Sequence, residues 1–436
     1  MTRISKQTLL LAWALVAVPG ALFAQTNGSN SPYSRYGFGL LSDRAVGFNK
    51  GMGGVAYGMR NGRELNPANP ASYSSIDSLT FLFDIGMTFQ NGNIDDGRAR
   101  TNARNTSLDY VTAGFRLSPN LGMSLGLLPY STIGYQMETS GYLGDGSATT
   151  TETYMGDGGL HKLYLGAGWK PFHPVSLGFN VGMLWGNMNH IVQAEVSTTD
   201  ANSLRRQYDT DVLTYTADFG VQMDFPINKD NELVVGLTYG LGHGIKSNAH
   251  FYNQIINSGT ILAGDSISTP DAFELPHTFG AGLSWKYKDR LRLAADYEFQ
   301  KWGSVRSPQV VESDAAIDYR PRTGMYKDAH RIAVGADYVA NPNGVRWRHH
   351  IRYRAGFEYK TSYTLVDGHE GPYTYTVSAG VGLPITNIYS NRSLLNLSVQ
   401  YQRVKPRMAG MLTENYLRFN IGIAFNERWF MKWKVE

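Results

Sequence analysis

The sequence has no cysteine, little net charge, and no long apolar run after its first 24 residues. Without cysteine the fold has no disulfides, so it must depend on backbone pairing and packing. Lysine and arginine number 40 against 36 aspartates and glutamates, and this net charge of +4 is too small to favour a nucleic-acid partner. No segment beyond the N-terminus has 18 uninterrupted apolar residues, which excludes a helical membrane protein.

The N-terminus has the layout of a secretory signal peptide. Arg3 and Lys6 precede the apolar run Leu9–Val18, and Ala21-Leu22-Phe23-Ala24 offers a cleavage site. The alternative is an uncleaved anchor, for which this run is short. We therefore predict a signal peptide at residues 1–24, and its removal would leave 412 residues (436 minus 24).

Glycine and tyrosine are abundant, with 48 and 27 residues, while the mean hydropathy is only −0.29. Fourteen segments alternate apolar and polar residues with a period of two, among them 78–90, 348–361 and 414–426. Many reach a dozen residues, whereas a tilted membrane-crossing strand needs about 9–11. Fourteen is an even number, as bacterial single-chain barrels require. The sequence therefore predicts an all-β fold, a 14-stranded antiparallel transmembrane β-barrel over residues 77–436.

The connections between these segments alternate in length, which predicts a turn side and a loop side. The links 118–120, 171–174 and 286–290 are short, whereas 91–106, 137–158, 250–272 and 303–327 are long. Tryptophan should mark the membrane interface on the turn side. The tryptophans expected there are Trp169, Trp285, Trp347, Trp429 and Trp433.

The segment Gly51–Asp77 is irregular, because its glycines break a helix and Pro67 and Pro70 stop strand pairing. Its apolar residues nevertheless require burial, and its backbone needs walls that satisfy its hydrogen bonds. We predict that residues 25–76 form a hatch inside the barrel. In the third barrel segment, Gly126-Leu127-Leu128-Pro129 places a proline where it removes a ladder donor, which predicts a kink at Pro129.

The plug-like segment with its Asn-Pro-Ala, the fourteen strands and the break in the third strand resemble the FadL-type outer-membrane transporters of hydrophobic compounds. The stretches SPYSRYGFG, MGG and FNERWFMKWKVE resemble the Bacteroidetes branch of that family. The resemblance implies a Gram-negative outer membrane, contact with its lipid, and passive uptake of hydrophobic molecules such as long-chain fatty acids. It also implies a lateral exit at the kinked strand, next to an Asn-Pro-Ala of the hatch. That motif is Asn69-Pro70-Ala71, with Asn66-Pro67-Ala68 as a second copy. The gating residues implied are therefore Asn66, Pro67, Ala68, Asn69, Pro70, Ala71, Gly126 and Pro129.

Charged residues within the barrel segments fall on the face opposite the apolar one. An arginine or lysine facing lipid would cost roughly 2–4 kcal/mol at the midplane. We expect these charges to pair across the lumen and hold the hatch, or to bind a ligand headgroup. The residues assigned to this lumen network are Asp84, Arg292, Arg331, Arg352, Arg354 and Arg418, with Asp218, Asp296, Glu298, Asp337 and Glu358 on the same face.

No catalytic constellation stands out, so we predict neither an enzyme nor a cofactor. Gly51-Met52-Gly53-Gly54 follows no strand and opens no helix, unlike a nucleotide loop. His349-His350 suits a solvated turn better than a metal site, and Asn91–Asp96 lacks the bidentate glutamate of a calcium loop. Two further hypotheses stay open: a FadL-like barrel that binds secreted proteins as a shuttle or scaffold without small-molecule transport, and an outer-membrane protein with a structural role alone.

Overall fold

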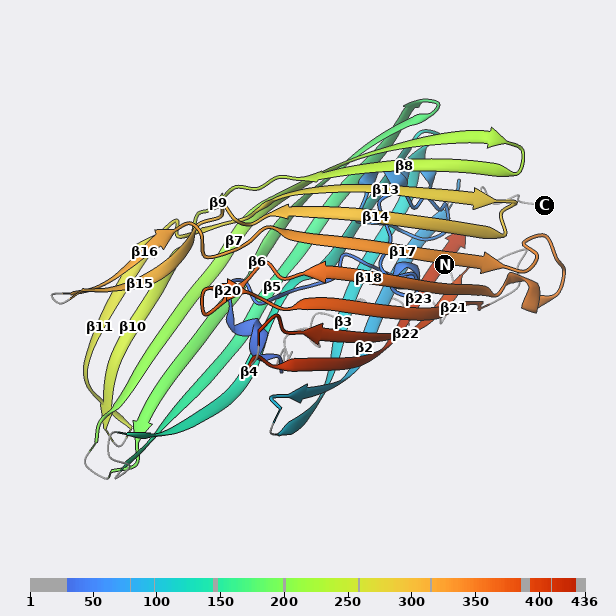
Figure 1. Ribbon diagram of the computed structural model, residues 1–436. Helices are drawn as coiled ribbons and strands as arrows, with labels where there is room; N and C mark the ends of the chain where they lie inside the picture. The colour runs from blue at the N-terminus through green and yellow to red at the C-terminus, as the bar shows by residue number, and fades with distance from the viewer. Residues whose placement is uncertain are drawn as a thin grey trace, which may run out of the picture.

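The computed structural model describes residues 30–78, 80–97, 99–143, 148–198, 201–257, 259–313, 316–385, 393–408 and 410–428. They form one closed, tilted barrel with a long curved extension at one end (Figure 1). Among these residues, no helix is long and apolar enough to cross a membrane. The predicted signal peptide and the tryptophans at 429 and 433 lie outside the described residues.

Fourteen antiparallel strands make the barrel wall, as predicted. They are β2 (Thr80–Asp95), β3 (Arg100–Ser118), β4 (Leu121–Leu143), β5 (Ala148–Phe172), β6 (Val175–Val196), β7 (Ser203–Asn228), β8 (Asn231–Gly240), β13 (His277–Tyr287), β14 (Leu291–Lys301), β17 (Ala329–Val339), β18 (Arg352–Thr361), β21 (Tyr373–Pro384), β22 (Leu394–Lys405) and β23 (Thr413–Arg428). The wall closes where β2 pairs with β23, from Thr80↔Arg428 to Asp95↔Thr413. A closed barrel leaves no edge strand within the membrane, as lipid requires.

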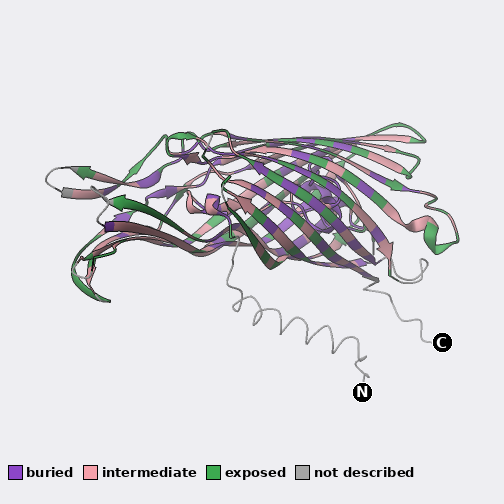
Figure 2. Cartoon of the chain, turned by 60° about the horizontal axis from the view of Figure 1, so that its bottom comes forward, coloured by how far each residue is buried: buried purple, intermediate pink, exposed green. Residues whose placement is uncertain are grey.

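Side chains on each wall strand alternate between an apolar outer face and a mostly polar lumen face (Figure 2). On β2, for example, Asp84 and Thr88 are buried in the lumen, while Met87 and Phe89 are exposed on the outside. Exposed apolar residues are normal singly, but a belt of them around a barrel indicates contact with lipid. The protein is therefore a transmembrane β-barrel.

The two ends of the barrel differ. Short turns join the strands at one end, where Trp169 and Trp347 are half exposed, and the 3₁₀ helix η3 (Trp347–His350) lies in the link between β17 and β18. At the other end the prediction of long loops over 91–106 and 137–158 is wrong, since β2–β3 and β4–β5 extend through them as hairpins. The polar sequence of these extensions hid them, because they stand above the lipid and need no apolar face.

Further antiparallel strand pairs lie at this outer end. They are β9–β12 (Gly244–Ile245 with Phe273–Glu274), β10–β11 (Asn248–Asn257 with Thr260–Pro270), β15–β16 (Ser307–Ser313 with Ala316–Arg322) and β19–β20 (Leu365–Val366 with His369–Glu370). Beneath them lies an apolar cluster centred on Trp302, which contacts Phe38, Tyr326 and Tyr363 with ring centroids 4.3–5.6 Å apart. We call this group the outer aromatic cluster. It fills the outer part of the lumen.

The N-terminal segment from Ser31 to Ile76 lies inside the barrel. It comprises η1 (Pro32–Arg35), the short strand β1 (Leu40–Leu41), the single-turn helix α2 (Gly47–Lys50) and η2 (Pro70–Ser75). Met52, Val55 and Met59 are almost fully buried against the wall. We call residues 31–76 the hatch. Glycine allows its close approach: a Cβ on Gly356 of β18 would lie 2.1 Å from the Gly53 nitrogen.

Candidate functional site

The barrel wall has a seam between β3 and β4. The two strands pair from Ser118↔Leu121 up to Val111↔Leu127, and no β3–β4 pairing is found above that point in the described residues. β3 instead continues with β2 alone as far as Arg100. β4 takes the hatch strand β1 as its neighbour, with Leu40↔Thr132 and Leu41↔Ser131 in register. The seam is thus a divergence of two wall strands, filled in part by the hatch.

Pro129 lies where the seam opens. The β4–β5 register shifts between Pro129 and Ser131, so Tyr130 is an extra, bulged residue. The freed Tyr130 carbonyl accepts a hydrogen bond from the Ser42 amide of the hatch at 2.9 Å. Proline has no N–H to continue the ladder, which explains why the irregularity falls here. The kink predicted from the sequence is therefore present, and Gly126 lies just below it, still paired with Thr112.

A cavity of about 680 Å³ lies between the hatch and the wall and borders the seam. Leu127 and Pro129 line it, although their position two and four residues beyond the exposed Leu125 places them on the lipid-facing side of β4. Leu108 of β3, the register partner of the exposed Met87, lines it on the other side. Residues of both wall faces therefore border one cavity at this level.

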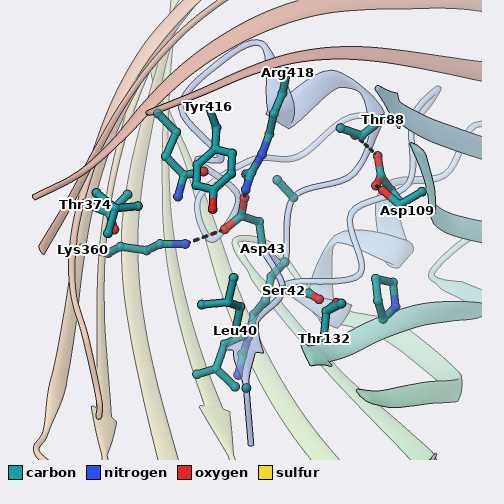
Figure 3. A pocket seen from close by; sticks show the side chains of 18 of the residues that line it. Leu40, Ser42, Asp43, Thr88, Asp109, Thr132, Lys360, Thr374, Tyr416 and Arg418 are labelled. Atoms are coloured by element: carbon teal, nitrogen blue, oxygen red, sulfur yellow. Dashed lines mark hydrogen bonds and ion pairs between the residues drawn. The ribbon is translucent and has the colours of Figure 1, made fainter. Parts of the chain in front are cut away.

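The lumen side of this cavity is charged. Asp43 follows β1, and its carboxylate lies 3.1 Å from Lys360 Nζ of β18 and 3.6 Å from Arg418 Nη1 of β23 (Figure 3). Across the cavity, Lys50 of the hatch pairs with Asp109 of β3 at 2.5 Å. The single carboxylate of Asp43 thus contacts two cations, Lys360 and Arg418. The hatch residues 40–43 bridge the cavity from β4 to the opposite wall.

Deeper ion pairs fix the hatch to the wall. Arg331 Nε lies 2.7 Å from Glu358, and its Nη2 donates to the carbonyls of Gly53 and Gly54 at 3.2 and 2.8 Å. Asp296 accepts from the backbone amides of Ala56 and Tyr57 at 2.5 and 3.0 Å. Arg331 is thus both ion-paired and hydrogen-bonded, as a buried cation requires, and Asp296 holds the hatch backbone through its Oδ2.

The remaining predicted lumen residues surround the same region. Arg354 lies 3.2 Å from Glu64 of the hatch, and Arg352 contacts Asp337. Arg292 is the register partner of Asp337 on β14. Asp84 accepts a hydrogen bond from Tyr110 at 2.9 Å. Of the six lumen residues singled out from the sequence, Arg331 and Arg418 line the seam cavity, whereas Asp84, Arg292, Arg352 and Arg354 do not.

Both Asn-Pro-Ala motifs lie in the hatch, away from the seam. Asn66 Nδ2 donates to the Ala56 and Met59 carbonyls at 2.6 and 3.0 Å, and Asn69 Nδ2 donates to the Tyr57 carbonyl at 2.8 Å. Asn69 also contacts Val221 on β7, and its Oδ1 accepts from Ala71 at the start of η2. The two asparagines therefore brace the hatch internally, and the structure does not bring Asn66–Ala71 together with Gly126 and Pro129 around the cavity.

Sequence reasoning missed Asp43, Lys50, Asp109 and Lys360 at the cavity, and Glu64 deeper in the lumen. Asp43 and Glu64 are acidic residues inside a segment predicted to be buried, and a buried acid requires a cation. The sequence alone could therefore have indicated that Asp43 and Glu64 each need a cationic partner. Lys360 belongs to a strand whose polar face was recognised, but its partner could not be known without the path of the hatch.

The described residues offer no group of three or more histidine, aspartate or glutamate side chains that could hold a metal ion. A family model described as BamG matches residues 4–436 of the sequence. A search of curated proteins gives no match.

Solved structures with the same fold include transporters of the FadL type. The P. putida toluene transporter TodX is similar with a TM-score of 0.61 at 14% identity, over 90% of this chain and 100% of TodX. The Ralstonia pickettii toluene transporter TbuX has a TM-score of 0.58 at 14% identity, over 89% and 99%. A Pseudomonas aeruginosa FadL homologue has a TM-score of 0.59 at 14% identity, over 88% and 99%. Similarity at this identity establishes the shared fold.

Proposed function

The chain belongs to the BamG family, and we propose that it is an outer-membrane channel that passes hydrophobic or amphipathic small molecules sideways through the seam between β3 and β4. The observation that carries this proposal is the cavity lined by residues of both wall faces. The toluene transporters TodX and TbuX, which have this fold, are named for a hydrophobic cargo, and this supports the same class of ligand here.

The lining of the cavity favours an amphipathic ligand of the long-chain fatty acid type. Leu41, Leu108 and Leu127 offer apolar contacts, whereas Lys360 and Arg418 offer cations next to a single shared carboxylate. A carboxylate headgroup would lie beside the two cations, and the tail would lie in the seam. Burial of the tail contributes about 25 cal/mol per Å² of apolar area. The concentration gradient supplies the direction, and no cofactor is needed.

The hatch strand β1 is the gate in this proposal. It occupies the upper part of the seam through only two register pairs with β4, Leu40↔Thr132 and Leu41↔Ser131. The outer aromatic cluster packs the lumen above the hatch, with Trp302 and Phe38 fully buried. A ligand that binds near the outer hairpins and reaches the cavity would therefore leave beside β1, through the wall, rather than along the barrel axis.

Narrowing the seam tests the proposal. Leu127→Trp adds a ring at the outer border of the cavity, and Leu125→Trp is its matched control, because Leu125 is 43% exposed on the same face of β4 but does not line the cavity. Transfer of a fluorescent fatty acid into proteoliposomes should fall with Leu127→Trp and stay unchanged with Leu125→Trp. Pro129→Val should slow apolar compounds but not small sugars. Equal rates of fatty-acid transfer for the wild type, Leu127→Trp and Leu125→Trp would refute passage through the seam.

A second function is favoured by the packed outer end. Because the outer aromatic cluster fills the lumen, the barrel could serve as a scaffold that binds secreted proteins through its outer hairpins without any flux. The stretches SPYSRYGFG, MGG and FNERWFMKWKVE resemble the Bacteroidetes branch, in which a FadL-like barrel serves protein secretion, and this resemblance supports the second function. Co-purification of defined secreted proteins, with no fatty-acid transfer by the wild type, would favour this second function over the channel.

A further inference from the structure

Beyond the barrel, the outer extension ends in a strand with an open edge. β11 (Thr260–Pro270) pairs along its whole length with β10, which in turn pairs with the outer part of β7. Its other edge pairs with no strand among the described residues. Nine of its eleven residues are exposed, and from Thr260 to Ser266 neither face of β11 is covered.

The neighbouring hairpin does not close this edge. β15–β16 contacts the inner side of the sheet rather than pairing with the edge of β11: Thr269 Oγ1 donates to the Tyr319 carbonyl, the Tyr319 ring packs on Phe251 with centroids 5.6 Å apart, and Glu312 pairs with Arg206 of β7 at 2.7 Å. From that point β11 and β16 point apart (Figures 1 and 2).

The edge carries few of the devices that protect natural edge strands. Such strands usually carry charges, prolines or bulges that discourage pairing with another chain. β11 has no lysine or arginine, one acid at Asp265, and its only proline is the terminal Pro270. A bulge at Leu262 leaves Ala263–Pro270 in regular register. Ile261 and Leu262 near the tip are 55% and 58% exposed.

We propose that the free edge of β11 is a docking site for an extended strand of another polypeptide, added to the sheet by backbone hydrogen bonds. Edge addition of this kind draws affinity from the main chain and specificity from alternate side chains. The inner face of β11 carries Ala263, Asp265 and Ile267, of which Ile267 packs against the outer aromatic cluster. The partner strand should therefore be apolar on this face, with a basic residue opposite Asp265.

A second copy of this chain fits the edge less well. Asp265 is the middle residue of Thr260–Pro270, so antiparallel pairing of two β11 strands about their centres would place the two Asp265 carboxylates opposite each other. Like charges directly opposite in a sheet are destabilising. The charge pattern therefore favours a different polypeptide.

The probe for this site is a labelled peptide with the sequence of Ala249–Ile256, because β10 is the strand that β11 already pairs with. Two versions carry lysine or glutamate at the position of Asn253, the register partner of Asp265. We expect the purified protein in detergent to bind the lysine peptide about threefold more tightly than the glutamate peptide. The Asp265→Lys variant should reverse this order, and a peptide with methylated backbone nitrogens should not bind.

The outcomes separate the possibilities. Reversal of the preference by Asp265→Lys supports strand addition at β11. Absence of binding, or equal binding of both peptides to both proteins, overturns it. Concentration-dependent dimerisation that competes with the peptide would assign the edge to a second copy and also overturn it. Asp265 lies outside the seam cavity, so fatty-acid transfer should be unchanged in the variant, whatever the result for the channel.

Discussion

The guanidinium of Arg354 on β18 lies 3.2 Å from the carboxylate of Glu64 in the hatch, and both side chains are almost fully buried. Arg354 also donates to Asn396 on β22 at 2.6 Å, and its Nε lies 3.5 Å from Asp337. One arginine therefore ties the hatch to three strands of the wall. The hatch is held by specific ion pairs as well as by its apolar contacts.

Removing one partner of this pair should destabilise the protein strongly. Arg354→Met or Glu64→Leu alone leaves a buried charge without its partner, which costs about 3–5 kcal/mol. The double variant should be more stable than either single variant, because it leaves neither charge unpaired at that contact. Urea unfolding in detergent micelles, followed by tryptophan fluorescence, measures all three. Additive losses in the double variant would contradict a direct coupling.

Asp43→Asn should change ligand preference at the seam. The substitution removes the carboxylate that Lys360 and Arg418 share, so both cations become available to an anionic headgroup. We expect dodecanoate to bind more tightly to the variant, whereas dodecanol, which has the same chain and no charge, should bind as before. Titration of each ligand against both proteins gives the result. A parallel change for the two ligands would argue against a headgroup position beside Asp43.

Gly54→Ala should loosen the hatch. Gly54 has a φ of +73°, and a Cβ there would lie 2.4 Å from Arg331 Nη2, which donates to the Gly53 and Gly54 carbonyls. Gly97 provides the control, since its φ is +85° but no atom lies within 4 Å of the Cβ position. The left-handed backbone costs an alanine about 1–2 kcal/mol at either site. A larger loss of unfolding free energy for Gly54→Ala than for Gly97→Ala would therefore measure the close approach, and equal losses would deny it.

Phe38→Ala should open the outer end of the barrel. Phe38 packs on Phe273 and Trp302 with ring centroids 5.4 and 5.6 Å apart, and it is fully buried. Truncating such a ring costs about 3–5 kcal/mol and leaves a cavity in the outer aromatic cluster. Planar-bilayer recordings should show increased conductance relative to wild type and to Tyr142→Ala, because Tyr142 is 83% exposed. Unchanged conductance would mean that other parts of the hatch close the barrel.

The period-two pattern predicted the fourteen wall strands because lipid imposes an apolar face on each of them. It failed above the membrane, where β3 begins with Arg100-Thr101-Asn102-Ala103-Arg104 and both faces meet water. The break at Pro129 could be predicted because it follows from the missing N–H of that one residue. The Asp43–Lys360 and Glu64–Arg354 pairs join residues 317 and 290 positions apart. Only the path of the hatch through the lumen determines such partners, and the sequence pattern does not encode that path.

The most direct measurement of gating by the hatch strand uses the absence of cysteine from the chain. Leu40→Cys with Thr132→Cys places a cysteine pair at register partners of β1 and β4, within the reach of a disulfide. Ala113→Cys with Leu125→Cys is the control pair, at register partners of β3 and β4 below the seam. The account predicts that oxidation stops fatty-acid transfer in the first protein, that reduction restores it, and that neither affects the control. Transfer that continues at the same rate through the oxidised Leu40→Cys/Thr132→Cys protein would contradict it.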